Sequence, residues 1–246
     1  MSAHPAHPTD HTIGELWNQV TGTQPAPPGW LVLTTGAVAL LAVLVRPVWH
    51  VTRNAVTIAH EGGHGLVARA TGRRLAGIRL HSDTSGLTLS YGRPTGPGMI
   101  LTAAAGYPAP ALLGLGCAAL LAADRITLLL WLAVVLLLAL LIRIRNAYGL
   151  FIVLVAGGAF FLVSWFGSAE VQAGFAYLGC WFLLFAAVRP VLELQHQRRA
   201  GWARDSDADQ LARLTHVPGL AWITVFLLIA LACLALGASW LLQPLQ

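Results

Sequence analysis

The sequence predicts an all-α polytopic membrane protein of about seven transmembrane helices, with a small β-hairpin after the second helix. Apolar residue types make up 57% of the 246 residues, and charged residues only 10%. A soluble domain has about 25% charged residues. The apolar residues recur in runs that can cross about 30 Å of hydrocarbon, which takes roughly 20 helical residues. This composition excludes a disordered chain and a coiled coil, and it indicates an integral membrane protein.

The chain divides into a polar N-terminal tail and one membrane domain. Residues 1–29 are polar and rich in proline, so we expect them to form a disordered tail. Residues 30–246 form the membrane domain. The predicted spans are 30–49, 51–70, 98–121, 125–143, 147–166, 171–189 and 218–242. The second span is the most polar, because it contains Arg53, Asn54, His60, Glu61 and His64.

Two stretches between the spans have a character of their own. In residues 73–92, apolar residues alternate with others on both sides of the turn 83–86, which is typical of a β-hairpin. The alternating residues are Ile78, Leu80, Leu87 and Leu89. Residues 190–217 form the one long polar connection between spans, and they carry the acidic run 205–209.

The distribution of arginine predicts how the chain lies in the membrane. With the N-terminus in the cytoplasm, the inner segments hold twelve arginines and the outer segments hold three, Arg46, Arg53 and Arg125. Arginine excess marks the cytoplasmic side. We therefore expect the N-terminus inside, the C-terminus outside, and the hairpin and acidic run both on the cytoplasmic side. This pattern also accounts for the basic charge, so no nucleic-acid partner is expected.

The second predicted span carries the motif His60-Glu61-Gly62-Gly63-His64. Histidines four residues apart lie on one face of a helix, so both imidazoles can bind one Zn²⁺. Glu61 lies about 100° around the helix from His60, which suits a general base that contacts the attacking water. The alternative is a polar patch that packs against other helices, but ionisable groups within a span are costly and usually functional. Gly62 and Gly63 leave room for a neighbouring helix.

A zinc site needs a third protein ligand, and the residues alone leave several candidates open. On the same side of the membrane as the histidines lie Glu193, His196, Asp205, Asp207, Asp209, His81 and Asp83. Asp205 and Asp209 would share one face of a helix and Asp207 the opposite face, which leaves the acidic run unresolved. The run can equally be a helix N-terminus capped by Ser206, with acids in its first turn. Capping and metal binding can coexist in one segment.

Five segments form a combination that is more specific than the HExxH motif alone. They are HEGGHGLVARATGRR, GIRLHSDTSGLTLS, AAAGYPAPALLG at 103–114, RNAYG at 145–149 and SDADQLARLTHVPG at 206–219. With them the chain resembles the site-2-protease-type intramembrane zinc metallopeptidases, specifically the bacterial B-like branch of peptidase family M50. The resemblance implies that Asp207, in Ser-Asp-Ala, is the third ligand beside His60 and His64. The better-known site-2 proteases carry this ligand in an Asp-Gly motif, which this sequence lacks.

The resemblance implies an intramembrane zinc endopeptidase of the bacterial cell membrane that acts in regulated intramembrane proteolysis. Its substrate would be a membrane protein, expected to have a single span. Water activated by Zn²⁺ would attack the peptide bond, with Glu61 as general base. An unwound substrate strand can add to an edge of the 76–90 hairpin. Tyr107 and Asn146 match positions in the resembling segments and are candidates for substrate binding, although Asn146 can instead cap a helix at a tight turn.

Two other classes of function stay open at this point. A catalytically silent membrane scaffold of the same family would bind partners without cleaving them, and loss of Glu61 or of a motif histidine would favour it. All three residues are present. A metal-ion transporter would use the histidine pair as a transit site, but the other predicted spans hold almost no ionisable residue. If Asp207 is the ligand, alanine at Asp205 or Asp209 is expected to have little effect.

Overall fold

The structure is a computed structural model and describes residues 13–201 and 205–243. These residues are mostly helical, and strands β1 (Arg74–Leu80) and β2 (Gly86–Tyr91) form one antiparallel pair. The helices are α1 (Ile13–Thr21), α2 (Gly29–Leu44), α3 (Arg46–Ala70), α4 (Pro97–Ala104), α5 (Pro108–Ala122), α6 (Ile126–Leu141), α7 (Ala147–Phe166), α8 (Ala169–Ala186), α9 (Val188–Arg199), α10 (Asp207–Thr215) and α11 (Gly219–Leu241).

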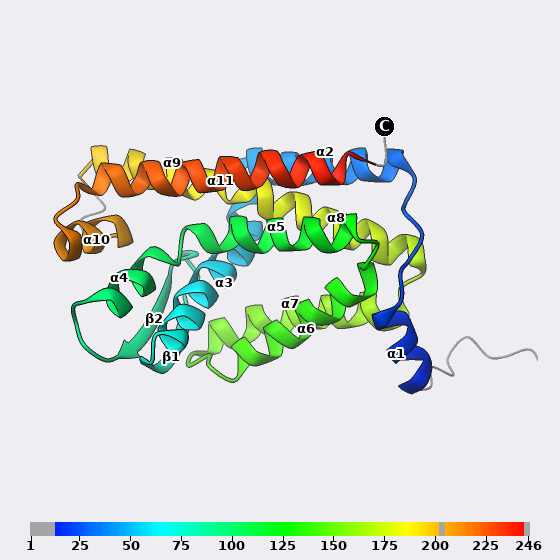
Figure 1. The fold of residues 1–246 in the computed structure, drawn as a ribbon, viewed down its shortest axis with the longest axis horizontal. Helices are drawn as coiled ribbons and strands as arrows, with labels where there is room; N and C mark the ends of the chain where they lie inside the picture. Colours follow the sequence, from blue (N-terminus) through cyan, green and yellow to red (C-terminus); the bar gives the residue numbers. More distant parts are fainter. Residues whose placement is uncertain (1–12, 202–204, 244–246) are drawn as a thin grey trace, which may run out of the picture.

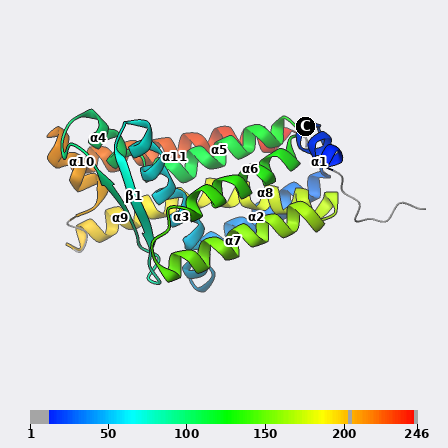
Figure 2. The same ribbon diagram turned by 90° about the horizontal axis from the view of Figure 1, so that it is seen from below.

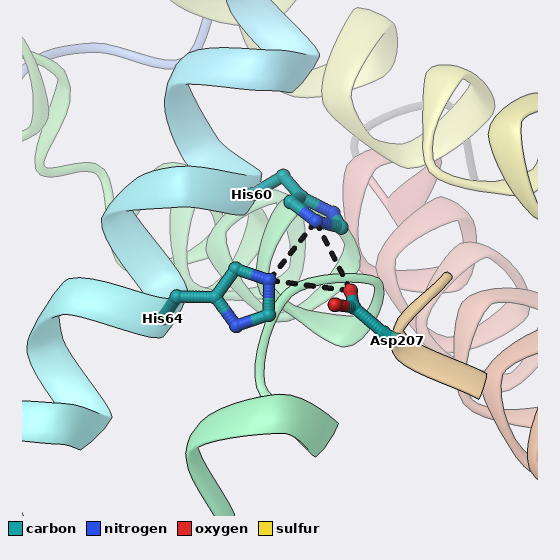
Figure 3. A group of neighbouring side chains, drawn as sticks. All are labelled: His60, His64 and Asp207. Atoms are coloured by element: carbon teal, nitrogen blue, oxygen red, sulfur yellow. Dashed lines mark hydrogen bonds and ion pairs between the residues drawn. The ribbon is translucent and has the colours of Figure 1, made fainter. Parts of the chain in front are cut away.

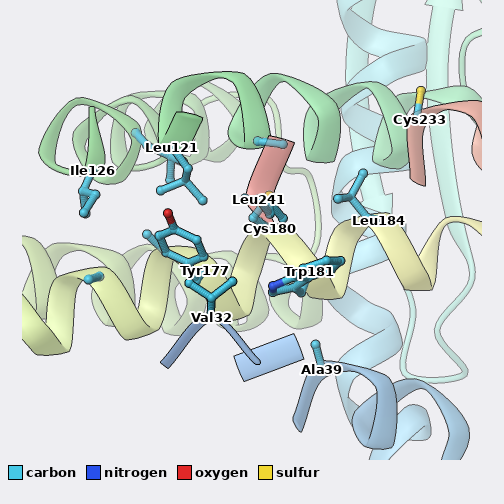
Figure 4. Packing of buried hydrophobic residues seen from close by; sticks show 14 of the residues in the cluster. Val32, Ala39, Leu121, Ile126, Tyr177, Cys180, Trp181, Leu184, Cys233 and Leu241 are labelled. Atoms are coloured by element: carbon cyan, nitrogen blue, oxygen red, sulfur yellow. The ribbon is translucent and has the colours of Figure 1, made fainter. Parts of the chain in front are cut away.

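Four apolar helices, α2, α5, α8 and α11, run side by side along the molecule, and α6 and α7 cover one side of them (Figures 1 and 2). Their shared core includes Tyr177, Trp181, Leu184 and Leu241 (Figure 4). Small residues let the helices approach closely, since a side-chain carbon at Gly237 would lie 2.7 Å from Leu184. Close packing of this kind holds helices together in lipid, where burial of apolar surface provides little drive.

Two sharp bends set the direction of the helices that carry the motifs. The first, of 101°, separates α2 from α3 at Val45, and a proline lies in the first turn of α3, where a missing N–H is tolerated. The second, of 67°, separates α4 from α5 just before Pro108. As a result α3 crosses the bundle instead of running along it, and the α4–α5 bend lies against α3 (Figure 1).

The seven spans predicted from the sequence are not confirmed. By length and composition, three helical stretches can cross a membrane: α7, the α8–α9 stretch Ala169–Arg199, and α11. The number rises to as many as five if each bent pair forms one span, and α6 is apolar but has only 16 residues. The largest difference concerns the predicted span 51–70. It lies in α3, the polar arm of a bent pair, which does not qualify as a span by itself.

Part of the expected N-terminal tail is helical. Residues 1–12 lie outside the described residues, but Ile13–Thr21 forms α1, which packs against α6. The guanidinium of Arg125 donates to the carbonyl oxygen of Thr21, and the Gln24 N–H donates to the carbonyl oxygen of Asp124 at 2.9 Å. These contacts hold the segment before α2 against the α5–α6 turn, so the expectation of a disordered tail does not hold for α1.

Both ends of the described chain lie at the same end of the bundle (Figures 1 and 2). Leu241, near the end of α11, shares a core cluster with Ile126 at the start of α6. We expected the two termini on opposite sides of the membrane from two antiparallel spans at 30–49 and 51–70, whereas α2 and α3 meet at an angle of 101°. Arg125 lies at this end, whereas Arg53 lies at the far end of α2, 3.3 Å from Glu193 of α9.

The predicted β-hairpin is present, with Ile78 of β1 opposite Thr88 of β2. Residues 143–146 extend the sheet on the other edge of β1. There the Ile78 N–H donates to the Arg143 carbonyl oxygen at 2.8 Å, and the Arg145 N–H donates to the Ile78 carbonyl oxygen at 2.9 Å. β1 therefore has neighbours on both edges. The outer edge of β2 makes no backbone hydrogen bond to another element within the described part of the chain.

Candidate metal centre

Three side chains from two distant segments meet near the end of the bundle that lies away from the termini (Figures 1 and 3). His60 and His64 lie one turn apart on α3, and Asp207 is the first residue of α10. The Nε2 atoms of the two histidines lie 3.1 Å apart, and Asp207 Oδ2 lies 3.2 Å from each of them. These three atoms form a nearly equilateral triangle, called the metal triangle below (Figure 3).

The metal triangle has the size that a tetrahedral ion requires. Zinc bonds of about 2.0–2.1 Å to nitrogen and oxygen, at tetrahedral angles, place neighbouring ligand atoms about 3.3 Å apart. Asp207 Oδ2 is buried without a regular hydrogen bond. Gly106 keeps the adjacent space open, because a side-chain carbon there would lie 2.6 Å from His60 Nε2. Two imidazoles and a carboxylate thus fit Zn²⁺ with one coordination position left for water.

The backbone of α4 determines which nitrogen of His64 faces the metal triangle. His64 Nδ1 lies 2.7 Å from the carbonyl oxygen of Thr102. Because a carbonyl oxygen can only accept, Nδ1 carries a proton, so Nε2 is the nitrogen that can offer its lone pair to a metal ion. An outer contact of this kind orients a metal-binding histidine and increases its basicity.

The two glycines of the motif differ in what surrounds them. A side-chain carbon at Gly63 would lie 3.0 Å from the Ala105 carbonyl oxygen and would overlap Ala109. The close approach that we expected from the sequence therefore occurs at Gly63, where the α4–α5 bend packs on α3. Nothing lies within 4 Å of the corresponding position at Gly62, so no neighbouring helix uses the room there.

The acidic run contains both a helix cap and a potential ligand. Ser206 caps α10 by accepting from the Asp209 N–H at 3.3 Å, and Asp209 Oδ2 lies 2.6 Å from Ser206 Oγ. Asp209 Oδ1 also pairs with Arg198 of α9 at 2.8 Å. These contacts turn Asp209 away from the histidines, and Asp207, on the other face of the first turn, points toward them (Figure 3).

Asp207 is ionised in this position. Burial acts to raise the pKa of Asp207, but the nearby imidazoles of His60 and His64 outweigh this effect and hold the pKa well below its usual range. The deprotonated carboxylate is also the form that binds a metal ion.

Glu193 and His196, two further candidate ligands, lie on α9 and outside the metal triangle. Glu193 Oε1 accepts from Trp49 Nε1 at 3.0 Å and pairs with Arg189 at 2.8 Å, while Glu193 Oε2 lies 3.3 Å from Arg53. Arg189 also lies over the Trp49 ring, 4.7 Å from its centroid. This network joins α9 to the start of α3. Glu193 therefore stabilises the packing of α9 against α3, a role that the sequence did not indicate.

The remaining candidates also have other partners. Asp83 accepts from the Ser85 hydroxyl at 2.7 Å, and His81 Nδ1 lies 3.2 Å from the same hydroxyl, so both belong to the hairpin turn. Hydrogen bonds from Ser85 lower the pKa of Asp83. Asp205 lies 3.6 Å from Arg213, and 91% of its side chain is exposed. Asp207 is thus the one candidate third ligand that the described structure brings to the histidines.

Glu61 is buried, with 4% of its surface exposed, and its carboxylate contacts the hairpin. Thr88 Oγ1 donates to Glu61 Oε2 at 2.6 Å. A side-chain carbon at Gly86 would lie 2.5 Å from Glu61 Oε1, so β2 passes directly over the carboxylate. Within the described residues, Glu61 has no ion pair.

Tyr107 lies at the site, beside His60. The two rings meet edge to face with their centroids 4.9 Å apart, and Tyr107 stacks on Phe226 of α11 at 5.3 Å. Aromatic pairs at these separations are favourable. Tyr107 therefore supports the His60 imidazole and borders the same space as the metal triangle.

Asn146 contacts the edge of β1 through its side-chain amide. Its Nδ2 donates to the Leu80 carbonyl oxygen at 2.6 Å, and its Oδ1 accepts from the Leu80 N–H at 3.2 Å. The side-chain amide thus occupies the edge of β1 as a further strand would. Although Asn146 precedes α7, its side chain makes no capping hydrogen bond to that helix.

Three residues of the site are not identified by the sequence analysis. Gly106 lies within the run 103–114, whose resemblance is the one available signal for it. Thr102 acts through its backbone carbonyl and Thr88 through a contact between a strand and a helix. The resemblance of segment 77–90 is the one signal for Thr88, and the role of Thr102 leaves no pattern in the sequence.

Comparison with known families gives one result. A family model described as Peptidase M50B-like matches residues 33–237. This range includes the metal triangle, Glu61 and the hairpin. Comparisons with curated proteins and with solved structures give no match.

Proposed function

The chain belongs to the Peptidase M50B-like family, whose model covers most of its length, and on this basis we propose that it is an intramembrane zinc endopeptidase. The observation that carries the proposal is the metal triangle of His60, His64 and Asp207, with Glu61 next to His60 on the same helix. Apolar helices long enough to span a bilayer support the membrane setting.

In the proposed hydrolysis, three residues hold the metal ion and a fourth transfers the proton. His60, His64 and Asp207 would hold the metal ion, which when bound polarises the scissile carbonyl and activates the attacking water. Glu61 accepts a proton from that water as the new C–O bond forms, and returns it to the leaving nitrogen as the C–N bond breaks. Because Asp207 comes from α10, which packs against α4, the site is complete only when α10 is docked.

The substrate is expected to be a single-span membrane protein. A peptide bond in a helix is shielded by its own turn, so the substrate must unwind before cleavage. The outer edge of β2 can accept the unwound strand and satisfy its backbone groups, whereas residues 143–146 occupy the edge of β1. A strand added to β2 lies close to Glu61, because β2 contacts the Glu61 carboxylate.

The end of the bundle that carries the site is proposed to face the cytoplasm. The hairpin, α9 and α10 lie at this end and are rich in arginine, whereas Arg125 lies at the end with the termini (Figure 1). Arginine excess marks the cytoplasmic side. Both ends of the described chain would then lie outside, in place of the cytoplasmic N-terminus that the sequence alone suggested.

Metal content and cleavage test this function together. The purified protein should hold about one Zn²⁺ per chain, and His60→Ala or His64→Ala should lose most of it, because two ligands rarely retain zinc. Glu61→Gln should keep the zinc and lose about 10²-fold or more in cleavage rate. Equal zinc content in the wild type and both histidine variants would reject the metal site. Zinc binding without cleavage would favour the silent scaffold, and zinc uptake into vesicles would favour a transporter.

A further inference from the structure

The two strands of the hairpin differ in where their apolar side chains lie, since β1 buries Ile78 and Leu80 whereas β2 exposes its leucines. Leu87 and Leu89 of β2 point outward, with 45% and 39% of their surface exposed. Gly86 and Thr88, which alternate with them, face α3 and touch Glu61. The inward face of β2 therefore lies against the Glu61 carboxylate, and its outward face carries the leucines.

The Thr88 hydroxyl is the one hydrogen-bond donor to the Glu61 carboxylate among the described residues. It lies 2.6 Å from Oε2 and 3.1 Å from the Glu61 main-chain oxygen, and its single proton favours the shorter, charged partner. Glu61 is 4% exposed, and this bond gives its buried carboxylate a polar partner in place of water. The bond ties Oε2 to β2 and leaves Oε1 without a hydrogen bond within the described structure.

Gly86 is the second residue of β2 that restricts the position of the Glu61 carboxylate. A side-chain carbon at this position would lie 2.5 Å from both Glu61 Cγ and Oε1. The carboxylate therefore lies in a gap between Gly86 and Thr88, where it has little freedom to rotate. A general base must be held within hydrogen-bond reach of the water it deprotonates, and a loosely held carboxylate would spend most of its time elsewhere.

We infer that Thr88 is a positioning residue, which holds Glu61 Oε2 through its hydroxyl so that Oε1 is free to accept the proton. This inference rests on the proposed function for its catalytic consequence, but the contact itself can be tested separately. Since β2 also carries the free strand edge of the hairpin, the element that would receive the substrate is the same one that orients the base.

Thr57 provides a matched control. It lies on α3 one turn before Glu61, and its Oγ1 donates to the Thr84 carbonyl oxygen of the hairpin turn at 2.8 Å. Thr57→Val and Thr88→Val each remove one hydroxyl from the same interface between α3 and the hairpin. A purely structural role predicts that the two variants behave alike.

The test compares Thr88→Val, Thr88→Ser and Thr57→Val by infrared spectroscopy and by kinetics. With ¹³C-labelled glutamate, the Glu61 carboxylate band is identified as the one that disappears in Glu61→Gln. The band should shift in Thr88→Val, return in Thr88→Ser, and stay in place in Thr57→Val. The kcat of Thr88→Val should fall about tenfold to a hundredfold with KM and zinc content unchanged, and Thr88→Ser should restore it.

An unchanged Glu61 band in Thr88→Val, or an equal shift in Thr57→Val, would overturn the inference. Thr88→Ala repeats the comparison if valine prevents folding. The band reports on the contact whether or not the protein is a peptidase. Failure of the proposed function would instead appear as no cleavage by the wild type, or as Glu61→Gln cleaving at the wild-type rate.

Discussion

Within the described residues, Asp207 links α10 to the two histidines of α3, so it tests the proposed metal site at its most distant ligand. Asp207→Asn keeps the shape of the side chain and removes the charge, so zinc affinity should fall by at least about 100-fold and cleavage should be lost. Zinc content after dialysis measures this directly. Asp205→Asn is the control, since Asp205 is 91% exposed and lies outside the site. Full zinc content in Asp207→Asn would show that another group completes the site.

Asp209 makes contacts that the sequence alone did not indicate, so we now expect its substitution to have an effect. It closes the capping box with Ser206 and pairs with Arg198 of α9. Asp209→Ala should destabilise α10 by about 1–2 kcal/mol and weaken zinc binding by misplacing Asp207. Thermal unfolding with and without zinc checks both effects. Identical melting temperatures and zinc affinities in Asp209→Ala and the wild type would refute this role.

Among the secondary-structure elements, β1 has one edge closed by the backbone of residues 143–145 and by the side chain of Asn146. Asn146→Ala removes both hydrogen bonds to Leu80, each contributing about 0.5–1.5 kcal/mol. The amide proton of Leu80 should therefore exchange faster with deuterium, while those of α7 should not change. Hydrogen exchange measured by mass spectrometry can resolve these segments. If exchange is unaffected and only the KM for substrate rises, Asn146 binds substrate instead.

The secondary-structure elements also show which features of the fold and the site local sequence patterns can predict. The HExxH helix, the hairpin and the choice of Asp207 follow from spacing, alternation and family resemblance, which all depend on nearby residues. The 101° bend at Val45 does not follow from such local patterns. The predicted spans 30–49 and 51–70 are long enough to be two antiparallel helices, so their length does not indicate a bend between them. Asn146 shows the same limit. Its side chain meets Leu80, which is 66 residues away in the chain, so no local pattern indicates the contact.

At the scale of the whole molecule, the bend changes the expected topology. Reporter fusions at residue 85 and at residue 200 should both report the cytoplasm, whereas fusions before residue 13 and after residue 246 should both report the outside. The reason is that the site lies at the arginine-rich end and both ends of the described chain lie at the other (Figure 2). Termini on opposite sides would contradict the arrangement of α2 and α3 as one bent pair.

Glu61-dependent proteolysis within the membrane is the central claim, and quantitative proteomics of membrane fractions tests it most directly. Cells with the wild-type chain are compared with cells that carry Glu61→Gln, with new protein N-termini labelled in both. Thr57→Val serves as a folded control in the same helix. We predict that a small set of single-span proteins accumulates intact in Glu61→Gln and that their cleaved ends, present in the wild type, disappear. The same membrane proteins and the same new N-termini in both strains would contradict the claim.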